Sequence, residues 1–326
     1  MITSLITGAN GFTGSNMAEY LLKKGHRVIC QVRKTSDLTN LADLEVEYRY
    51  GDVALPETLP SILEDIEYIF HFAGKTKARS EAEYMLVNAE GTANLAKACL
   101  NAPKLKMLVY ISSLAAVGPQ QNSNPVNEST PPKPLTAYGR SKLKGEELLR
   151  QICGDKIPWC IIRPTGVYGP KDKDIFIYFK TINRGWKILL SGTKRMVSLI
   201  HAQDLADICY LASQKSPPGE IYMASDGKGY TWEELSVYIE KALNKNARKL
   251  IVPMCLTTPA ALMSEFIGRF QNKAVALNRE KIRELRAPGW VCSIRKAEKT
   301  LGFQVSFPIE EGVAETAKWY REKGWL

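Results

Sequence analysis

Three glycines near the start of the chain lie at three-residue spacing, Gly8, Gly11 and Gly14. An apolar run, residues 2–6, precedes them, and a helical pattern with a second apolar run, residues 28–32, follows. This order predicts a strand, a tight turn, a helix and a second strand. Glycines in such a turn let the backbone approach a pyrophosphate, and the N-terminus of the following helix attracts phosphate oxygens. The stretch therefore predicts a dinucleotide-binding unit, with a variant of the usual glycine spacing.

Strand-like and helix-like segments continue to alternate along the first half of the chain. Repeated alternation with short connections implies a parallel sheet that is covered by helices on both faces. Four prolines predict a loop over residues 125–134. Further strands are predicted at residues 45–50, 68–72, 107–111 and 159–162, and helices at residues 88–100 and 137–153.

The pattern changes after Pro164, where glycines and the charged residues 171–174 interrupt it. We therefore predict an α/β fold: a Rossmann-type doubly wound parallel sheet with a smaller, mostly helical C-terminal lobe that binds the substrate. The sheet domain is predicted to comprise residues 1–164 and 198–224, and the lobe residues 165–197 and 225–326. Later elements are predicted at residues 198–200, 204–212, 219–224, 232–243, 256–270 and 310–323.

Composition limits the classes of function. The net charge of +10 in 326 residues comes from scattered lysines and arginines, which argues against nucleic-acid binding. No apolar stretch reaches the ~18 residues of a membrane span, and the short apolar start is expected to be a strand rather than a signal. The seven cysteines form no C-x-x-C pair, and the three histidines are too dispersed for a metal site. We expect buried, reduced thiols in a cytoplasmic protein without a metal.

Tyr138 and Lys142 lie four residues apart at the start of the predicted helix 137–153, so they share one face. A lysine ammonium beside a tyrosine favours the phenolate and lowers the tyrosine pKa, which makes a general acid/base usable near neutral pH. Ser113 follows a predicted strand, and ligands of α/β sheets bind at the carboxyl ends of strands. Taken alone, the pair also fits a surface helix, the serine fits a turn, and Asn88 fits a helix N-cap.

Together these residues resemble the extended short-chain dehydrogenase/reductase superfamily, in the branch often labelled NAD-dependent epimerase/dehydratase. The resemblance extends over essentially the whole chain and implies a Rossmann-type fold with an NAD(P)-dependent activity. It rests on TGANGFTG (7–14), GDV (51–53), HFAG (71–74), NAEGTANL (88–95), ISSLAAVG (111–118), YGRSK (138–142), RPTGVYGP (163–170) and LIHAQDLAD (199–207).

The resemblance implies a catalytic triad of Ser113, Tyr138 and Lys142. Tyr138 would be the general acid/base, Lys142 would lower its pKa and bond the nicotinamide ribose, and Ser113 would hold the reacting oxygen. Asn88 matches a position that orders the helix behind the active site. The implied cofactor-binding residues are Gly8, Asn10, Gly11, Phe12, Gly14, Arg33, Asp52, Val53, Ala73, Gly74, Tyr138, Lys142, Pro164 and Val167.

The end of the second predicted strand discriminates between the two nicotinamide cofactors. An acidic residue there would bond the ribose 2′-hydroxyl of NAD, whereas an arginine would pair with the 2′-phosphate of NADP. The chain has Arg33 and Lys34 at this point, and Asp37 is expected to face solvent or cap the next turn. We therefore expect NADP rather than NAD, although a permissive NAD site would also tolerate a surface Arg-Lys pair.

The branch includes ketone reductases, 3β-hydroxysteroid-type dehydrogenases, nucleotide-sugar epimerases and nucleotide-sugar dehydratases. Leucine or alanine stands where the dehydratases have an acid pair just after this serine, and Thr165-Gly166 replaces the asparagine typical of nucleotide-sugar enzymes. Residues 32–41 resemble dihydroflavonol reductases and hydroxysteroid dehydrogenases, and also hopanoid-associated sugar epimerases. The first hypothesis is an NADP(H)-linked oxidoreductase acting on a ketone, aldehyde or secondary alcohol. The alternatives are an epimerase with tightly bound NAD and a cofactor-binding module without turnover.

The substrate site is expected in the C-terminal lobe, and the family often forms homodimers through two helices per subunit. These helices would be residues 88–100 and 137–153. The amphipathic segment 256–270 could line the pocket, meet a partner subunit or touch a membrane surface. The following residues are candidates for an apolar wall of this site, and the alternative is that most of them belong to the core: Tyr168, Phe176, Phe179, Trp186, Met196 and Leu199. Cations that could reach an anionic substrate are Lys171, Lys173, Arg184, Lys194 and Arg195.

Overall fold

The computed structural model describes residues 1–121, 124–191, 195–270, 275 and 278–326. Seven parallel strands form the central sheet, in the order β11-β6-β5-β4-β1-β2-β3. The order reverses direction between β1 and β4, and this switch point is where open α/β sheets bind ligands. The strands are β1 (Thr3–Thr7), β2 (Arg27–Val32), β3 (Glu47–Tyr50), β4 (Tyr68–His71), β5 (Met107–Ile111), β6 (Trp159–Pro164) and β11 (Glu220–Ala224).

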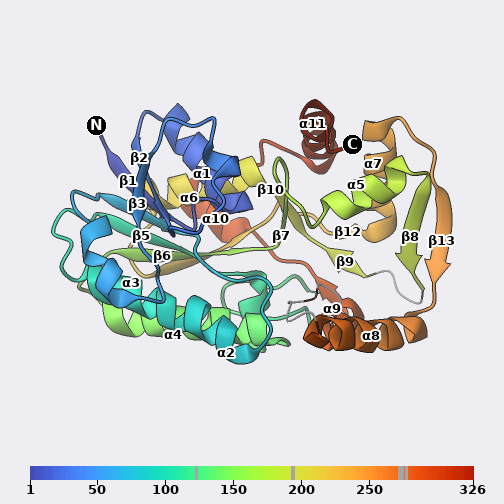
Figure 1. Ribbon diagram of the computed structural model, residues 1–326, viewed down its shortest axis with the longest axis horizontal. Helices are drawn as coiled ribbons and strands as arrows, with labels where there is room; N and C mark the ends of the chain where they lie inside the picture. The colour runs from blue at the N-terminus through green and yellow to red at the C-terminus, as the bar shows by residue number, and fades with distance from the viewer. Residues whose placement is uncertain (122–123, 192–194, 271–274, 276–277) are drawn as a thin grey trace.

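Helices cover both faces of this sheet (Figure 1). Successive strand residues point to opposite faces, so Ile6 belongs to one apolar core and Leu5 to the other. The core around Ile6 is completed by α1 (Phe12–Lys23), α6 (Ala202–Lys215) and α10 (Arg295–Leu301), and the core around Leu5 by α3 (Gly91–Cys99) and α4 (Ala137–Cys153).

A smaller C-terminal lobe lies beside the sheet (Figure 1). Its own core contains Phe179, Ile239 and Tyr320 from α5 (Phe176–Asn183), α7 (Trp232–Leu243) and α11 (Ile309–Glu322). Thr231 and Glu234 form a capping box at the start of α7. Other lobe elements are β8 (Trp186–Leu190), paired with β13 (Arg248–Val252); β9 (Met196–Val197), paired with β12 (Tyr230–Thr231) and β14 (Gly289–Trp290); α8 (Thr257–Phe270); and α9 (Arg279–Arg286).

The predicted fold class is confirmed, and the predicted segments 107–111, 137–153 and 232–243 match the observed elements in both bounds. The lobe also contains the short strands β8, β9, β12, β13 and β14, which were not predicted. The division into domains stays a prediction. Part of the predicted lobe, α10, packs against α6 and β11 of the sheet region.

The helix predicted at residues 88–100 has a different start. It is preceded by α2 (Glu81–Tyr84) and by a π-helical turn, η4 (Met85–Glu90), before α3 begins at Gly91. Asn88 therefore lies inside a continuous helical segment, and the alternative that it is an N-cap is wrong. π-Turns of this kind often occur at functional sites.

Candidate active site

The predicted site residues converge because they follow adjacent parallel strands. The carboxyl ends of parallel strands meet at one edge of a sheet. Every strand of the sheet except β11 is followed by, or ends with, a predicted site residue at that edge. In spatial order from β3 to β6 these residues are Asp52 after β3, Arg33 after β2, Gly8 after β1, Ala73 and Gly74 after β4, Ser113 after β5 and Pro164 at the end of β6. Val167 lies further on in β7 (Gly166–Tyr168), half-buried against the sheet core.

The glycine turn has the geometry that its sequence predicts. Gly8 has a φ of +67°, a left-handed conformation that favours glycine, and it turns the chain out of β1. A Cβ on Gly14 would lie 2.4 Å from the Gly8 carbonyl oxygen, so glycine lets α1 approach the turn closely. Gly11 is exposed and stands at the N-cap of α1, with Phe12 as the first helical residue. The start of α1 is therefore accessible to an anionic group.

Two side chains hold this turn against neighbouring strands. Asn10 donates from Nδ2 to the Asp37 carbonyl oxygen at 3.2 Å, and its own carbonyl accepts from Asn40 at 3.1 Å. Gln31, buried in β2, donates to the Gly51 carbonyl oxygen and accepts from the Gly8 N–H at 3.4 Å. Sequence reasoning missed Gln31, although a lone polar residue inside an apolar strand is a usable signal.

The segment after β2 fits the prediction for Asp37. Its carboxylate accepts hydrogen bonds from the N–H and the hydroxyl of Thr39, which lower its pKa, so it caps the next turn. Arg33 is exposed at the sheet edge, where its N–H donates to the Ser36 hydroxyl at 3.0 Å. Asp52 also closes a turn, because its carboxylate accepts from the Ala54 N–H at 2.9 Å. Val53 is buried.

The structure brings Ser113 and Tyr138 together. Thr136 caps α4, accepting the Gly139 N–H at 3.1 Å, and this starts the helix directly before Tyr138. The Ser113 oxygen accepts the Ala115 N–H at 3.1 Å, and the serine side chain also hydrogen-bonds to Tyr138. This hydrogen bond lowers the pKa of Tyr138 and so opposes the effect of burial.

Lys142 lies one turn further along α4, but its ammonium does not act on Tyr138 as predicted. It donates to the Ile111 carbonyl oxygen at 2.8 Å and lies 4.9 Å from the centre of the Tyr110 ring. Burial lowers the pKa of Lys142 to about 8. Burial also raises the pKa of Tyr138 to about 12 despite the Ser113 hydrogen bond. The expected depression of the tyrosine pKa is therefore wrong for this arrangement, and Tyr138 is a protonated phenol at neutral pH.

Asn88 connects this helix to the end of β4. Its amide nitrogen donates to the Lys75 carbonyl oxygen at 3.0 Å and to the Ser141 hydroxyl at 2.9 Å, and its amide oxygen accepts the Lys75 N–H at 2.7 Å. A Cβ on Gly74 would lie 3.1 Å from that oxygen and 3.3 Å from the Lys142 Nζ. The backbone at Gly74 therefore lies next to the side-chain amide of Asn88 and the ammonium of Lys142.

His71, at the end of β4, forms buried hydrogen bonds in the same region, and sequence reasoning assigned it no role. Its ring nitrogens hydrogen-bond to Thr7 at 2.7 Å and to Thr92 at 3.0 Å, and Thr92 donates to the Asn88 carbonyl oxygen. Burial, with the nearby Lys142, lowers the pKa of His71 to about 3. The ring is thus neutral and serves as a structural link between β1 and α3.

A buried ion pair lies behind Lys142. Glu146, which is fully buried, accepts from Arg163 Nε at 2.9 Å and Nη2 at 2.6 Å, and from the Ser112 hydroxyl at 2.5 Å. The carboxylate raises the pKa of Lys142 and so opposes the effect of burial. Glu146 stands four residues after Lys142, a spacing that could have placed both on one helix face.

Helix α9 from the C-terminal lobe packs against the start of α4. Glu280 accepts the Ala137 N–H at 2.7 Å, and Glu284 lies close enough to Tyr138 to raise its pKa. The Tyr84 ring lies 6.0 Å from the Tyr138 ring, centre to centre. Sequence reasoning missed these contacts, because Glu280 lies 143 residues after Ala137 in the chain.

The turn after Ser113 is apolar and closely packed. It forms a 3₁₀ turn, η5 (Leu114–Ala116), in which Leu114 and Ala116 are buried. Leu114 belongs to a small apolar cluster that Trp290 of β14 packs against; its members are Leu114, Val117, Val126, Met223 and Cys292. Ser113 therefore borders an apolar region, and Leu114 and Ala115, the two residues that follow it, carry no carboxylate.

The candidate substrate residues in the lobe divide into core and surface. Tyr168, Phe179 and Leu199 are buried and Phe176 packs against the same core, so the alternative reading of core residues is correct for these four. Trp186 and Met196 are exposed. Among the candidate cations, Lys171 lies 3.6 Å from Glu19, Lys173 and Arg184 are exposed, and Arg195 donates to the Leu285 carbonyl oxygen. Lys194 lies outside the described residues.

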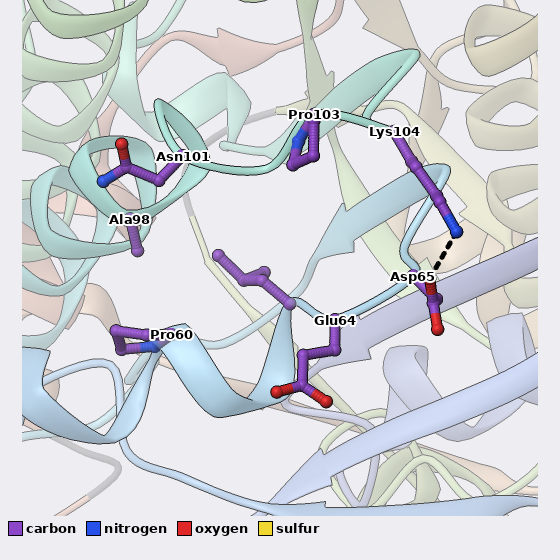
Figure 2. A pocket seen from close by; sticks show the side chains of 8 residues that line it. Pro60, Glu64, Asp65, Ala98, Asn101, Pro103 and Lys104 are labelled. Atoms are coloured by element: carbon purple, nitrogen blue, oxygen red, sulfur yellow. Dashed lines mark hydrogen bonds and ion pairs between the residues drawn. The ribbon is translucent and has the colours of Figure 1, made fainter.

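A surface hollow of about 420 Å³ lies away from the site (Figure 2). It contains Pro103 and the Lys104–Asp65 ion pair of 2.5 Å, just before the amino end of β5, whereas Ser113 follows the carboxyl end. All seven cysteines are free thiols, and six are buried as predicted. Cys255 is exposed, in the turn before α8. Across the described ranges, His, Cys, Asp and Glu side chains form no group of three that could hold a metal ion.

These features fit a dinucleotide cofactor. The accessible N-terminus of α1 suits the pyrophosphate, the close backbone at Gly74 suits the ribose, and the Lys142 ammonium lies beneath it. Comparison with known proteins agrees. Residues 4–224 match the family model described as the NAD dependent epimerase/dehydratase family. The chain belongs to this family.

Similar proteins cover the whole chain. A "Ceramide reductase" of Caulobacter vibrioides is 30% identical over 324 residues, covering 98% of this chain and 95% of the relative. A "Sterol demethylase protein B" of Methylococcus capsulatus is 28% identical and covers 100% of both chains. The crystal structure of a UDP-glucose 4-epimerase from Thermotoga maritima has a TM-score of 0.82 at 20% identity, covering 99% of both chains, and shares the fold. The protein is therefore an NAD(P)-dependent enzyme of the extended short-chain dehydrogenase/reductase type, with hydride-transfer chemistry.

Proposed function

We propose that the protein is an NADPH-linked reductase of a ketone or aldehyde group in an apolar, lipid-like molecule. The observation that carries this proposal is the Ser113–Tyr138 hydrogen bond beside the closely packed apolar turn Leu114–Ala116. The two relatives named above for a ceramide and for a sterol support an apolar substrate. The absence of acidic residues after Ser113 argues against a dehydratase.

Each catalytic residue has one physical task in this proposal. The nicotinamide supplies the hydride when the cofactor is bound. Tyr138, with its pKa raised to about 12, is protonated at neutral pH and donates its proton to the carbonyl oxygen. Ser113 positions that oxygen through its hydroxyl, and the Lys142 ammonium, fixed by the Ile111 carbonyl, holds the ribose hydroxyls.

Tyr138→Phe tests the proton donor. It should lower kcat by about 10²–10⁴ while leaving the dissociation constant of the cofactor nearly unchanged, because only the hydroxyl is removed. Tyr238→Phe, a tyrosine of the remote helix α7, is the matched control and should retain full activity. A Tyr138→Phe enzyme with wild-type turnover would remove tyrosine as the acid.

The type of reaction is tested separately with wild-type protein. NADPH should be consumed stoichiometrically with a panel of apolar ketones and aldehydes, as followed by the absorbance of the reduced nicotinamide. The alternative, a nucleotide-sugar epimerase, would contain copurified NAD and interconvert sugars without a net change in that absorbance. Conversion of UDP-glucose without net oxidation would reject the reductase and favour the epimerase.

We also propose that NADP is preferred over NAD. The exposed Arg33 guanidinium follows β2, at the position where it can pair with a 2′-phosphate, and Asp37 is engaged with Thr39. Arg33→Asp should shift the ratio of kcat/KM for NADPH over NADH by at least about tenfold toward NADH. An unchanged ratio would reject Arg33 as the determinant.

A cytoplasmic homodimer completes the proposal. The two helices expected at the interface are α3 and α4, which pack against each other on one face of the sheet. Leu100, at the end of α3, leaves an exposed apolar side chain there. Light scattering of the purified protein should give twice the mass of the chain, and a monomer at micromolar concentration would reject this interface.

A further inference from the structure

Helix α8 exposes apolar side chains in an unusual pattern. Leu256, Met263 and Ile267 are spaced by seven and four residues, so they lie along one face of the helix and its preceding turn. Each is between 49% and 64% exposed, and Leu262 beside them is 48% exposed. Pro259 and Ala260 continue this apolar face and are also exposed. We call these six residues the α8 apolar face.

Two polar residues of α8, Glu265 and Thr258, contact α9. Glu265 accepts from the Arg279 N–H at 2.7 Å and its Nε at 3.0 Å, and Thr258 accepts from Arg286 Nη2 at 2.8 Å. Ala261 is fully buried. A surface helix normally buries its apolar side and exposes its polar side. The reversed arrangement indicates that the α8 apolar face meets another apolar phase.

Helix α9, next to α8 along the lower edge of the lobe in Figure 1, carries a complementary charge distribution. Its two carboxylates are half-buried: Glu280 accepts the Ala137 N–H at the start of α4, and Glu284 raises the pKa of Tyr138. Its exposed charged residues are all cations: Arg279, Lys281, Arg283 and Arg286. Lys281 also pairs with Glu284 at 2.9 Å. Arg279 and Arg286 thus attach α9 to α8, and the exposed surface of α9 beside α8 carries only cationic charged groups.

We propose that α8 and α9 form a peripheral membrane-binding surface, with the α8 apolar face inserted among the acyl chains of an anionic bilayer and the α9 cations against its headgroups. An apolar face beside lysine and arginine is the pattern of helices that lie in the plane of a bilayer surface. A protein partner would not require one sign of charge beside the apolar face, whereas anionic headgroups do. No helix within the described ranges is long and apolar enough to cross a bilayer, so the contact is at the surface.

The surface also adjoins the reacting group. Helix α9 contacts α8 and also the start of α4, at Ala137 and Tyr138. The membrane contact itself does not rest on the proposed reductase function, and it is tested without any turnover.

Vesicle sedimentation of the full chain tests this inference. Wild-type protein should sediment with phosphatidylcholine vesicles that contain phosphatidylglycerol, and less with pure phosphatidylcholine. Met263→Asp/Ile267→Asp should weaken binding at least about tenfold, because two inserted apolar groups become anions. Val237→Asp, an exposed residue of α7, is the matched control and should bind as wild type.

A charge reversal tests the α9 cations. Arg283→Glu should weaken binding to the anionic vesicles by more than about fivefold, and Lys180→Glu on α5 should not. Circular dichroism and the melting temperature verify that every variant is folded. Failure of wild-type protein to bind anionic vesicles, or equal loss in Val237→Asp, would overturn the inference. If Met263→Asp/Ile267→Asp instead converts a dimer into monomers without any vesicle binding by the wild type, the face is a self-association surface and the inference is rejected.

Discussion

The buried pair of Glu146 and Arg163 offers a sharp test of how the sheet supports the site. Arg163 is 2% exposed and Glu146 is fully buried, and two hydrogen bonds of 2.9 and 2.6 Å join them. Glu146→Gln keeps the shape of the side chain and removes its charge. The guanidinium is then left buried without a counter-ion, and the amide nitrogen of the new side chain faces a donor.

Breaking a buried ion pair from one side typically costs about 3–5 kcal/mol, because an uncompensated charge remains in the interior. Total stabilities of about 5–15 kcal/mol leave a folded but weakened protein. Glu147→Gln is the matched control: its carboxylate lies 3.2 Å from Lys144, with both side chains 51% exposed, and it should cost less than about 1 kcal/mol. The replacement of both partners, Glu146→Leu with Arg163→Met, should be less destabilising than Glu146→Gln alone.

Urea unfolding followed by tryptophan fluorescence measures these differences in the free energy of unfolding. A second readout separates structure from site: Glu146 raises the pKa of Lys142, so Glu146→Gln should lower that pKa below its value of about 8. Lys142 then loses its proton at lower pH, and the alkaline decline of kcat should move toward neutral pH. A Glu146→Gln protein within about 1 kcal/mol of wild type, or additive effects in the double variant, would refute the reasoning.

Three further predictions follow from buried groups. Gly14→Ala places a Cβ 2.4 Å from the Gly8 carbonyl oxygen and should weaken cofactor binding at least about tenfold by isothermal titration, since α1 must move; unchanged binding would contradict the close packing. His71 has a pKa of about 3 in the folded protein and 6.5 in the unfolded chain, so the unfolded chain binds the proton first and the free energy of unfolding should fall as the pH drops from about 6.5 to 3. His71→Gln should reduce this pH dependence in unfolding experiments at several pH values. An unchanged pH dependence would exclude His71 as its source. Asp204, buried, accepts the N–H groups of Ser306 and Phe307 at 3.0 Å each, so Asp204→Ala should cost about 1–3 kcal/mol in the same unfolding assay, whereas Asp207→Ala, three residues along the same helix, should cost less.

The sheet and its site edge could be predicted because their signals are local. Most strands of the sheet contain a short apolar run, although β3 does not, and the βαβ rule places all carboxyl ends on one edge. Ser113, Tyr138 and Lys142 needed only one strand end and one helical turn to be placed together. Gln31 and His71 stood as single polar residues in apolar strands, so their buried bonds were within reach of the same reasoning.

The strands of the lobe gave no comparable signal. β8 pairs with β13, which lies beyond α6, β11 and α7 in the chain, and both strands mix charged with exposed apolar residues. Alternation toward one core is the usual evidence for a half-buried strand, and here it is absent. β8 also packs against α5 and α7, and no local pattern reveals these contacts.

Helix α9 shows most directly why the substrate side could not be predicted from the sequence. Its residues, REKIRELR, are typical of a solvated charged helix, and a single inward apolar residue, Ile282, is buried. Contacts with distant segments distinguish these charged residues. Glu280 accepts a hydrogen bond from the start of α4, Glu284 raises the pKa of Tyr138, and Arg279 donates to Glu265 of α8. A carboxylate that touches a catalytic helix and a cation that faces solvent are equivalent in a sequence pattern. The fold separates them, so that α9 lies next to Tyr138 on one side and carries part of the proposed membrane surface on the other.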